Sequence, residues 1–92
     1  MTFILTSRPL RPELPIALRD AIESSPGKTV VLCYGDAIYG LRNGPPHPRA
    51  DFLVLAPEAE ARGCAFPPPI HPISYAEAVD LLLESDRQIS CV

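Results

Sequence analysis

Cys33 is the residue of this chain that its sequence neighbours place best for chemistry. It ends an uninterrupted apolar run that starts at Val30, and Tyr34-Gly35-Asp36 follow it directly. A thiol at such a position could carry sulfur if the amino end of a following helix stabilised its thiolate. No Lys, Arg or His adjoins Cys33, so we favour the alternative that it is a small buried strand residue, as free cysteines commonly are.

Polar residues follow the first two apolar runs of the chain. Thr6 and Ser7 end the first run, and Tyr34, Gly35 and Asp36 end the second. If the two runs are parallel neighbours, these five residues meet at the carboxyl edge of the sheet, where α/β proteins usually bind ligands. They are therefore our candidates for ligand or partner contact. Gly35 permits a sharp turn, and we expect Asp36 to cap the next helix, with a role as acid, base or partner contact as the alternative.

The apolar runs lack polar alternation, which is typical of strands buried on both faces. We predict one three-layer α/β/α domain over residues 1–92, with a mostly parallel sheet of four to five strands. The expected strands are Thr2–Thr6, Lys28–Tyr34, Asp51–Leu55 and Ile70–Ile73, with an edge strand at Gln88–Val92. The expected helices are Pro12–Ile22, Asp36–Arg42, Pro57–Arg62 and one that begins at a capping box, Ser74–Glu77.

The helix after Ser74 carries an apolar stripe made of Tyr75, Val79, Leu82 and Leu83. A domain this small, built from short elements, cannot bury every large apolar side chain. We therefore predict a dimer or a larger oligomer.

Charge and length exclude several classes of partner. The net charge is −3 and the arginines form no basic stripe, so nucleic acid is not expected as a direct partner. No apolar run approaches the roughly 20 residues of a spanning helix, so no membrane partner is expected either. The first residues, MTFILTSRPL, lack the leading charge and the length of a signal peptide, which favours a cytoplasmic protein.

Cofactor and metal motifs are missing at their diagnostic positions. The turn after the first strand, Thr6–Leu10, has no glycine, so it matches neither a dinucleotide fingerprint nor a P-loop. His47 and His71 have no second ligand at metal spacing. We expect no cofactor and no metal.

The three cysteines contain no CxxC pair and indicate cytosolic thiols rather than a disulfide framework. Cys64 follows the third helix, so we expect it to be structural and to lie at the opposite end of the sheet. Cys91 is expected in a C-terminal tail, where exposure alone could make it reactive.

Four stretches in order along the chain resemble the DsrE/DsrF/DsrH superfamily, in particular the small TusB/DsrH branch of sulfur-relay proteins. They are Ile4–Pro9, Val31–Leu41, Val54–Gly63 and Ile73–Leu82 with Gln88. The chain departs from the family pattern at Gly35-Asp36, where the family's Asp-Gly is reversed, and in its proline-rich loops.

The resemblance implies a role in persulfide transfer, which serves tRNA thiolation or the oxidation of stored sulfur. Sulfur-carrying members have a cysteine just after the third strand, where this chain has Ala56-Pro57-Glu58. The resemblance therefore implies an accessory subunit that lacks the principal carrier cysteine and assembles with DsrE-like and DsrF-like chains or with itself. If the chain has direct chemistry, Cys33 is the candidate thiolate for attack on a sulfane sulfur.

Two alternatives share this fold, because a fold alone does not fix a function. One is a homo-oligomeric small-molecule binder that uses the crevice between Thr6-Ser7 and Tyr34-Gly35-Asp36. The other is a structural interaction module.

Overall fold

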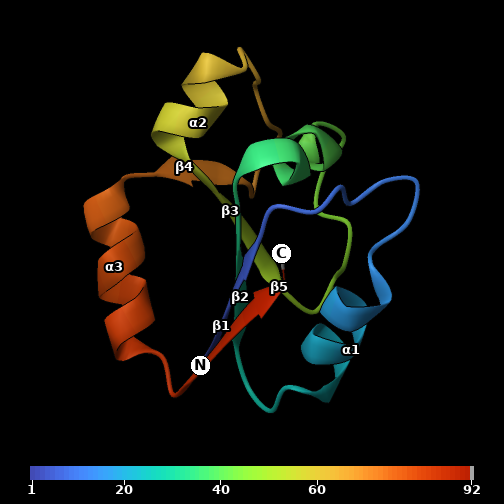
Figure 1. The fold of residues 1–92 in the computed structure, drawn as a ribbon, viewed down its shortest axis with the longest axis vertical. Coiled ribbons are helices and arrows are strands. Elements are labelled where there is room, and N and C mark those ends of the chain that lie inside the picture. Colours follow the sequence, from blue (N-terminus) through green and yellow to red (C-terminus); the bar gives the residue numbers. More distant parts are fainter. Residues whose placement is uncertain (92) are drawn as a thin grey trace.

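The computed structural model describes residues 1–91 and contains a five-stranded parallel sheet with helices on both faces (Figure 1). The strand order is β4-β3-β2-β1-β5, and every neighbouring pair is parallel. This confirms the predicted fold class. The elements in chain order are β1 Thr2–Thr6, α1 Ile16–Ser24, β2 Thr29–Cys33, the 3₁₀ helix η1 Gly35–Leu41, β3 Asp51–Leu55, α2 Ala56–Ala61, β4 His71–Ile73, α3 Tyr75–Glu84 and β5 Arg87–Cys91.

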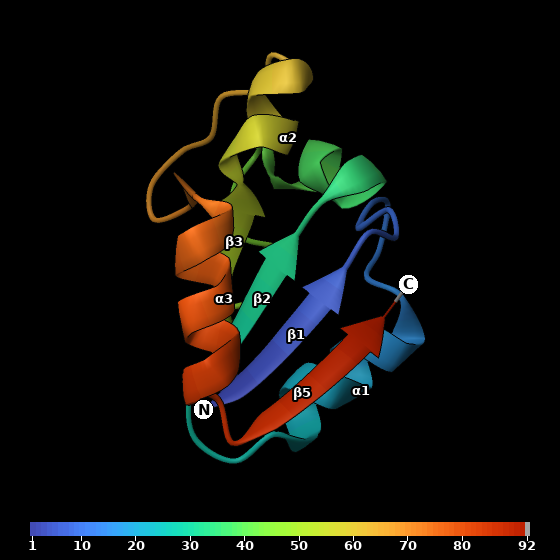
Figure 2. The same ribbon diagram turned by 60° about the vertical axis from the view of Figure 1, so that its left-hand side comes forward.

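The strand order explains how the helices are distributed over the sheet. From β1 to β4 the chain steps across the sheet in one direction, and right-handed crossovers keep those connections on one side. Residues of α1, η1 and α2 accordingly share one buried cluster. Only the return from β4 to β5 reverses direction, so α3 alone lies on the other face (Figure 2).

The core on the α1 side is fully enclosed. Ile4, Val31 and Val54 project from the sheet into this cluster and pack with side chains from α1 and η1. The buried cluster on the α3 side consists of Phe3, Val30, Leu32, Leu53, Leu55, Ile73 and Ala78. The largest fully buried side chains of the described residues all lie outside it: Ile4, Leu10, Leu18, Ile22, Ile38, Leu41, Val31, Val54, Thr6 and Cys33. The main core therefore sits between the sheet and the α1–η1 layer.

Helix α3 packs against the other face of the sheet through Ala78 and Leu81. Ala78 is buried and Leu81 is half-buried against strand residues such as Leu32 and Leu53. The predicted apolar stripe turns away from this contact: the exposed fractions are 57% for Tyr75, 52% for Val79, 39% for Leu82 and 77% for Leu83. The stripe is present as predicted, but most of it is left in solvent.

Most predicted boundaries agree with the structure, and the largest difference is at the first helix. Strands β1 and β3 have the predicted bounds, and the Ser74 capping box is confirmed by two 3.1 Å bonds that Ser74 and Glu77 exchange between side chain and backbone N–H. Helix α1 begins at Ile16 rather than Pro12, because Pro15 has an extended backbone with ψ of 140° and serves as the N-cap.

Two further predictions concern the ends of the chain and the membrane. The last strand is Arg87–Cys91, and the predicted end at Val92 lies outside the described residues. None of the helices in the part of the chain that the structure describes has the length and apolar character needed to cross a membrane.

Candidate functional site

The carboxyl edge of the sheet brings the five predicted contact residues together. Strands β1 and β2 are neighbours, with Thr6 paired to Cys33, so the residues after each strand share one edge. The Tyr34 N–H donates to the Thr6 carbonyl oxygen at 3.1 Å. Gly35 has a φ of +55°, and a Cβ built at this position would lie 3.4 Å from the Cβ of Ser7. Glycine thus allows both the left-handed turn and the close approach of the two loops.

Thr6 is a structural residue of this edge. Its side chain is buried, and its Oγ1 donates to the Cys91 carbonyl oxygen at 2.8 Å and accepts from the Arg8 N–H at 3.3 Å. One hydroxyl therefore joins the ends of β1 and β5 and fixes the turn that leaves β1. With its hydrogen bonds used in this way, Thr6 positions its neighbours and has no donor left for a ligand.

The prediction that Asp36 caps the following helix is wrong. Tyr34 is the N-cap of η1, and no side chain makes a capping bond there. The left-handed turn at Gly35 already belongs to the helix, so Asp36 falls in the first turn with its side chain exposed. A carboxylate is favourable near the positive end of a helix. It remains free at the surface for a partner contact, which was the alternative role.

Glu58 is the residue of the edge that sequence reasoning missed. Its Oε1 accepts from the Gly35 N–H at 2.7 Å and lies 3.5 Å from Nη1 of Arg62. Glu58 lies in the first turn of α2, and its bond to Gly35 depends on β3 lying next to β2. The available signal was that both residues directly follow neighbouring parallel strands. Glu58 ties the start of α2 to the turn after β2.

Glu58 belongs to the β3–α2 junction. The residues at the β3–α2 junction are Ala56, Pro57 and Glu58, and none has a thiol. Because Glu58 is held by a backbone N–H and by Arg62, the junction is a fixed structural contact.

Cys33 is placed at the predicted strand end, but its environment opposes a sulfur-handling role. Its side chain is fully buried in the α1-side core. Burial raises the pKa of the thiol from 9.0 to about 12, because a thiolate loses its hydration there. The thiolate is the nucleophile in sulfur transfer, so a protonated, enclosed thiol is unreactive.

The other two cysteines differ from their predicted positions. The Cys64 N–H donates to Ala59 O at 3.2 Å, so Cys64 sits at the end of α2, which lies beyond the carboxyl ends of the strands rather than at the opposite end of the sheet (Figure 1). It is half-buried and follows the carboxyl end of α2, whereas the β3–α2 junction is at the amino end of that helix. Cys91 is a buried residue of β5 rather than part of an exposed tail, because β5 pairs with β1 up to Thr6.

No metal-binding group forms among residues 1–91: no three His, Cys, Asp or Glu side chains come close enough to hold an ion. His47 pairs with Glu23, with 3.2 Å between Nε2 and Oε2. His71 donates from Nδ1 to the Pro69 carbonyl oxygen at 3.3 Å. Both imidazoles thus have local structural partners.

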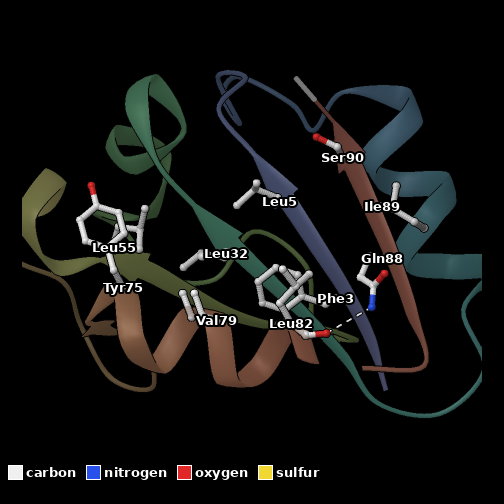
Figure 3. Close-up of a pocket in the computed structure, with 11 residues that line it drawn as sticks. Phe3, Leu5, Leu32, Leu55, Tyr75, Val79, Leu82, Gln88, Ile89 and Ser90 are labelled. Carbon is white, nitrogen blue, oxygen red and sulfur yellow. Dashed lines mark hydrogen bonds between the residues drawn. The ribbon is translucent and has the colours of Figure 1, made fainter. Parts of the chain in front are cut away.

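Two hollows flank α3, and neither is lined by the five predicted contact residues. The first has a volume of about 390 Å³ and is almost entirely apolar. Figure 3 shows Phe3, Leu5 and Leu32 on its strand side and Tyr75, Val79 and Leu82 on its helix side. The second lies on the other flank of α3 and is lined by charged side chains that include Lys28, Asp51 and Asp80. Both hollows therefore lie beside α3.

A scan of the sequence against protein-family models gives no match, and a search of the curated proteins gives none either. The site must therefore be judged on its own geometry. The edge contains a buried protonated thiol, a carboxylate bound to backbone and one exposed carboxylate. Such a set suits contact with another molecule better than covalent or acid–base chemistry.

Proposed function

We propose that this chain is an accessory subunit of a cytoplasmic sulfur-relay system and that it does not itself carry persulfide. The ordered resemblance to TusB/DsrH-like proteins supports the relay. The lack of a thiol at the β3–α2 junction and the burial of Cys33 support the accessory role. The observation that carries the proposal is the β3–α2 junction. There Glu58 accepts a hydrogen bond from the Gly35 N–H, in the region where a sulfur carrier is expected to have its cysteine.

In this proposal the carboxyl edge of the sheet contacts the carrier subunit. Ser7 and Tyr34 are half-buried there and Asp36 is exposed, so all three present surface to a partner. The bonds from Gly35 to Glu58 and from Thr6 to Cys91 hold these residues in fixed positions. The subunit would orient a DsrE-like or DsrF-like chain so that the partner's thiolate meets its sulfur donor, which is the geometric requirement of sulfur exchange.

Co-expression with tagged DsrE-like and DsrF-like chains tests the proposal. We expect a mixed complex that survives purification and is weakened by Asp36→Arg, which reverses an exposed charge at the proposed contact. Asp20→Arg is the matched control, because Asp20 is also an exposed acid and lies on α1. A mixed complex that neither substitution weakens would contradict the proposed contact. The absence of any mixed complex would contradict the relay role.

The non-carrier part is tested separately by incubating the purified chain with a persulfide donor. Mass spectrometry should find Cys33 unmodified, because its thiol is buried and protonated. A persulfide on Cys33 in the folded protein would make the chain a carrier and contradict the proposal.

A second candidate function is a self-associating interaction module with no sulfur role. The exposed apolar stripe of α3 favours it, because surfaces of this kind mark protein contacts. Self-association without any mixed complex would select this candidate.

A further inference from the structure

The α3 side of the sheet has too few helices to cover it. Five strands about 4.8 Å apart make a sheet about 19 Å wide, whereas a helix with its side chains is about 10 Å across. The single helix α3 lies between two hollows, so sheet surface is left open beside it. On the β1–β5 side this surface is the apolar hollow of Figure 3. We call this hollow the α3 groove.

The surface of α3 is divided into an apolar and an acidic part. With 100° between successive residues, Leu82, Tyr75, Val79 and Leu83 follow one another around the helix as a continuous stripe. Tyr75, Val79 and Leu82 line the α3 groove. The acids Glu77, Asp80 and Glu84 line the hollow on the opposite flank. The groove side of α3 therefore carries no charge that would repel another acidic chain.

The polar groups at the groove already have partners or face solvent. Nε2 of Gln88 donates to the Leu82 carbonyl oxygen at 3.2 Å and to Ser85 Oγ at 2.9 Å, and the first of these bonds is drawn in Figure 3. The amide nitrogen of Gln88 is thus committed to the end of α3. A small-molecule site usually combines an apolar wall with a few free polar groups that orient the ligand. The groove offers mainly apolar surface, which an apolar helix suits better.

We infer that the α3 groove is the binding site for α3 of a second copy of this chain, in a two-fold symmetric dimer. The lining of the groove is apolar, and the exposed stripe of α3, which is also apolar, lies directly beside it. Surfaces that adjoin in this way are self-complementary, so one two-fold rotation satisfies both copies. This inference is independent of the sulfur-relay proposal.

The arrangement of the dimer follows from the position of α3. A single two-fold rotation must exchange the two sheets and also move each α3 into the groove of the other copy. The axis must therefore lie midway between the two copies of α3 and run parallel to them. The two helices then lie side by side in one layer between the two sheets. The groove-side residue Val79, midway along α3, faces its own copy across the axis. Leu83 points away from its own sheet and reaches the partner's groove floor, which includes Leu5.

Light scattering and sedimentation of the purified full chain test the inference. We expect a dimer at micromolar concentration. Val79→Glu should weaken dimerisation about 100-fold or more, because each interface would bury two unpaired carboxylates. Ile16→Glu is the matched control: Ile16 is a β-branched residue that is 75% exposed at the start of α1, on the other face of the molecule. This variant should remain a dimer.

Ser90→Glu provides a second test that does not alter α3. Ser90 is exposed on β5 and lines the groove, so the added carboxylate should also produce a folded monomer. Circular dichroism of each variant checks folding. A wild-type chain that is monomeric at micromolar concentration would overturn the inference. So would dimers that persist in folded Val79→Glu and Ser90→Glu, or a small molecule that native mass spectrometry finds bound and that both variants lose.

The failure of this inference is distinct from the failure of the proposed function. A monomeric chain that still forms a mixed complex with relay subunits would contradict only the dimer. A dimer that never forms such a complex would contradict only the relay role.

Discussion

On the α1 side of the sheet, α1, η1 and the loop between β1 and α1 close over the strands, and residues such as Leu10, Leu18 and Ile38 are almost fully buried. On the α3 side, one helix packs on strands that are just as apolar, and four of its large apolar side chains remain exposed. The strand residues of the two faces are of the same kinds. The difference comes from topology, since three crossovers fall on one face and a single crossover falls on the other.

The comparison shows why an exposed apolar surface here need not be a defect of folding. The strands and helices follow one another in the predicted order, but one helix cannot cover the width of a five-stranded sheet. The surplus apolar surface is then available for a second chain. The following predictions test the difference between the two faces, beginning with the largest expected effect.

Truncation should be far more costly on the closed face than on the open one. Leu18→Ala on α1 should lower the free energy of unfolding by about 2–5 kcal/mol, because it leaves a cavity in an enclosed core. Leu83→Ala on α3 should change it by less than about 0.5 kcal/mol, when measured by urea unfolding in the Val79→Glu background to exclude dimer effects. Equal losses at the two positions would contradict the comparison.

Added volume should show the same difference with a smaller effect. Gly40 of η1 packs so closely that a Cβ would lie 2.7 Å from the Cβ of Leu10. Gly40→Ala should therefore lower the free energy of unfolding by about 1–3 kcal/mol through overpacking. Ser90→Val adds carbon to the open groove and should be neutral to within about 0.5 kcal/mol, again in the Val79→Glu background. A tolerated Gly40→Ala would show that the α1 side is looser than described.

Removal of a helix cap should loosen only the α3 side. Ser74→Ala deletes the acceptor for the Glu77 N–H and should lower the free energy of unfolding by about 1 kcal/mol. Amide hydrogen exchange should become faster in α3, while α1, which has no side-chain cap, keeps its protection. Faster exchange in both helices would indicate that the two faces are coupled more strongly than we expect.

Thiol reactivity gives the smallest effect and tests how well the α1 side excludes solvent. At pH 8 a thiol reagent should modify the half-buried Cys64 in the folded protein, and Cys33 only after unfolding. Because burial raises the pKa of Cys33 from 9.0 to about 12, the folded chain keeps a proton that the unfolded chain releases. The Cys33 contribution to stability should be complete below about pH 9 and be lost as the pH rises towards 12.

The control for this pH dependence is Cys33→Ala. The difference in unfolding free energy between wild type and this variant should shrink above about pH 9. Taking this difference removes the contribution of the other titrating groups, which the two proteins share. Rapid modification of Cys33 in the folded protein would contradict the closed core.

Local signals in the sequence were sufficient for much of the fold. The unbroken apolar runs gave β1 and β3 with their correct bounds, and the Ser74–Glu77 pair gave the start of α3. These features depend on residues that are adjacent or one helical turn apart. The start of α1 was misplaced because Pro12 and Pro15 both suit a first helical turn, and the extended backbone at Pro15 decides between them.

The candidate site was only partly predictable, because its contacts join different strands. The meeting of Thr6-Ser7 with Tyr34-Gly35-Asp36 followed from parallel neighbours, and the structure agrees. The bond from Gly35 to Glu58 needed the position of a third strand. The stripe on α3 could be predicted from the helical spacing of its apolar residues. That spacing does not tell which other elements the apolar face of the helix will contact.

Oxidative cross-linking of Val79→Cys in a Cys64→Ser background tests the central claim most directly, namely that the open face of the sheet receives α3 of a second copy. The two-fold axis places the two copies of residue 79 opposite each other, so mild oxidation should convert most of the protein to a disulfide-linked dimer. Ile16→Cys in the same background should stay monomeric on a non-reducing gel, because residue 16 lies on the other face. Equal cross-linking of the two variants, or none with Val79→Cys, would contradict the account.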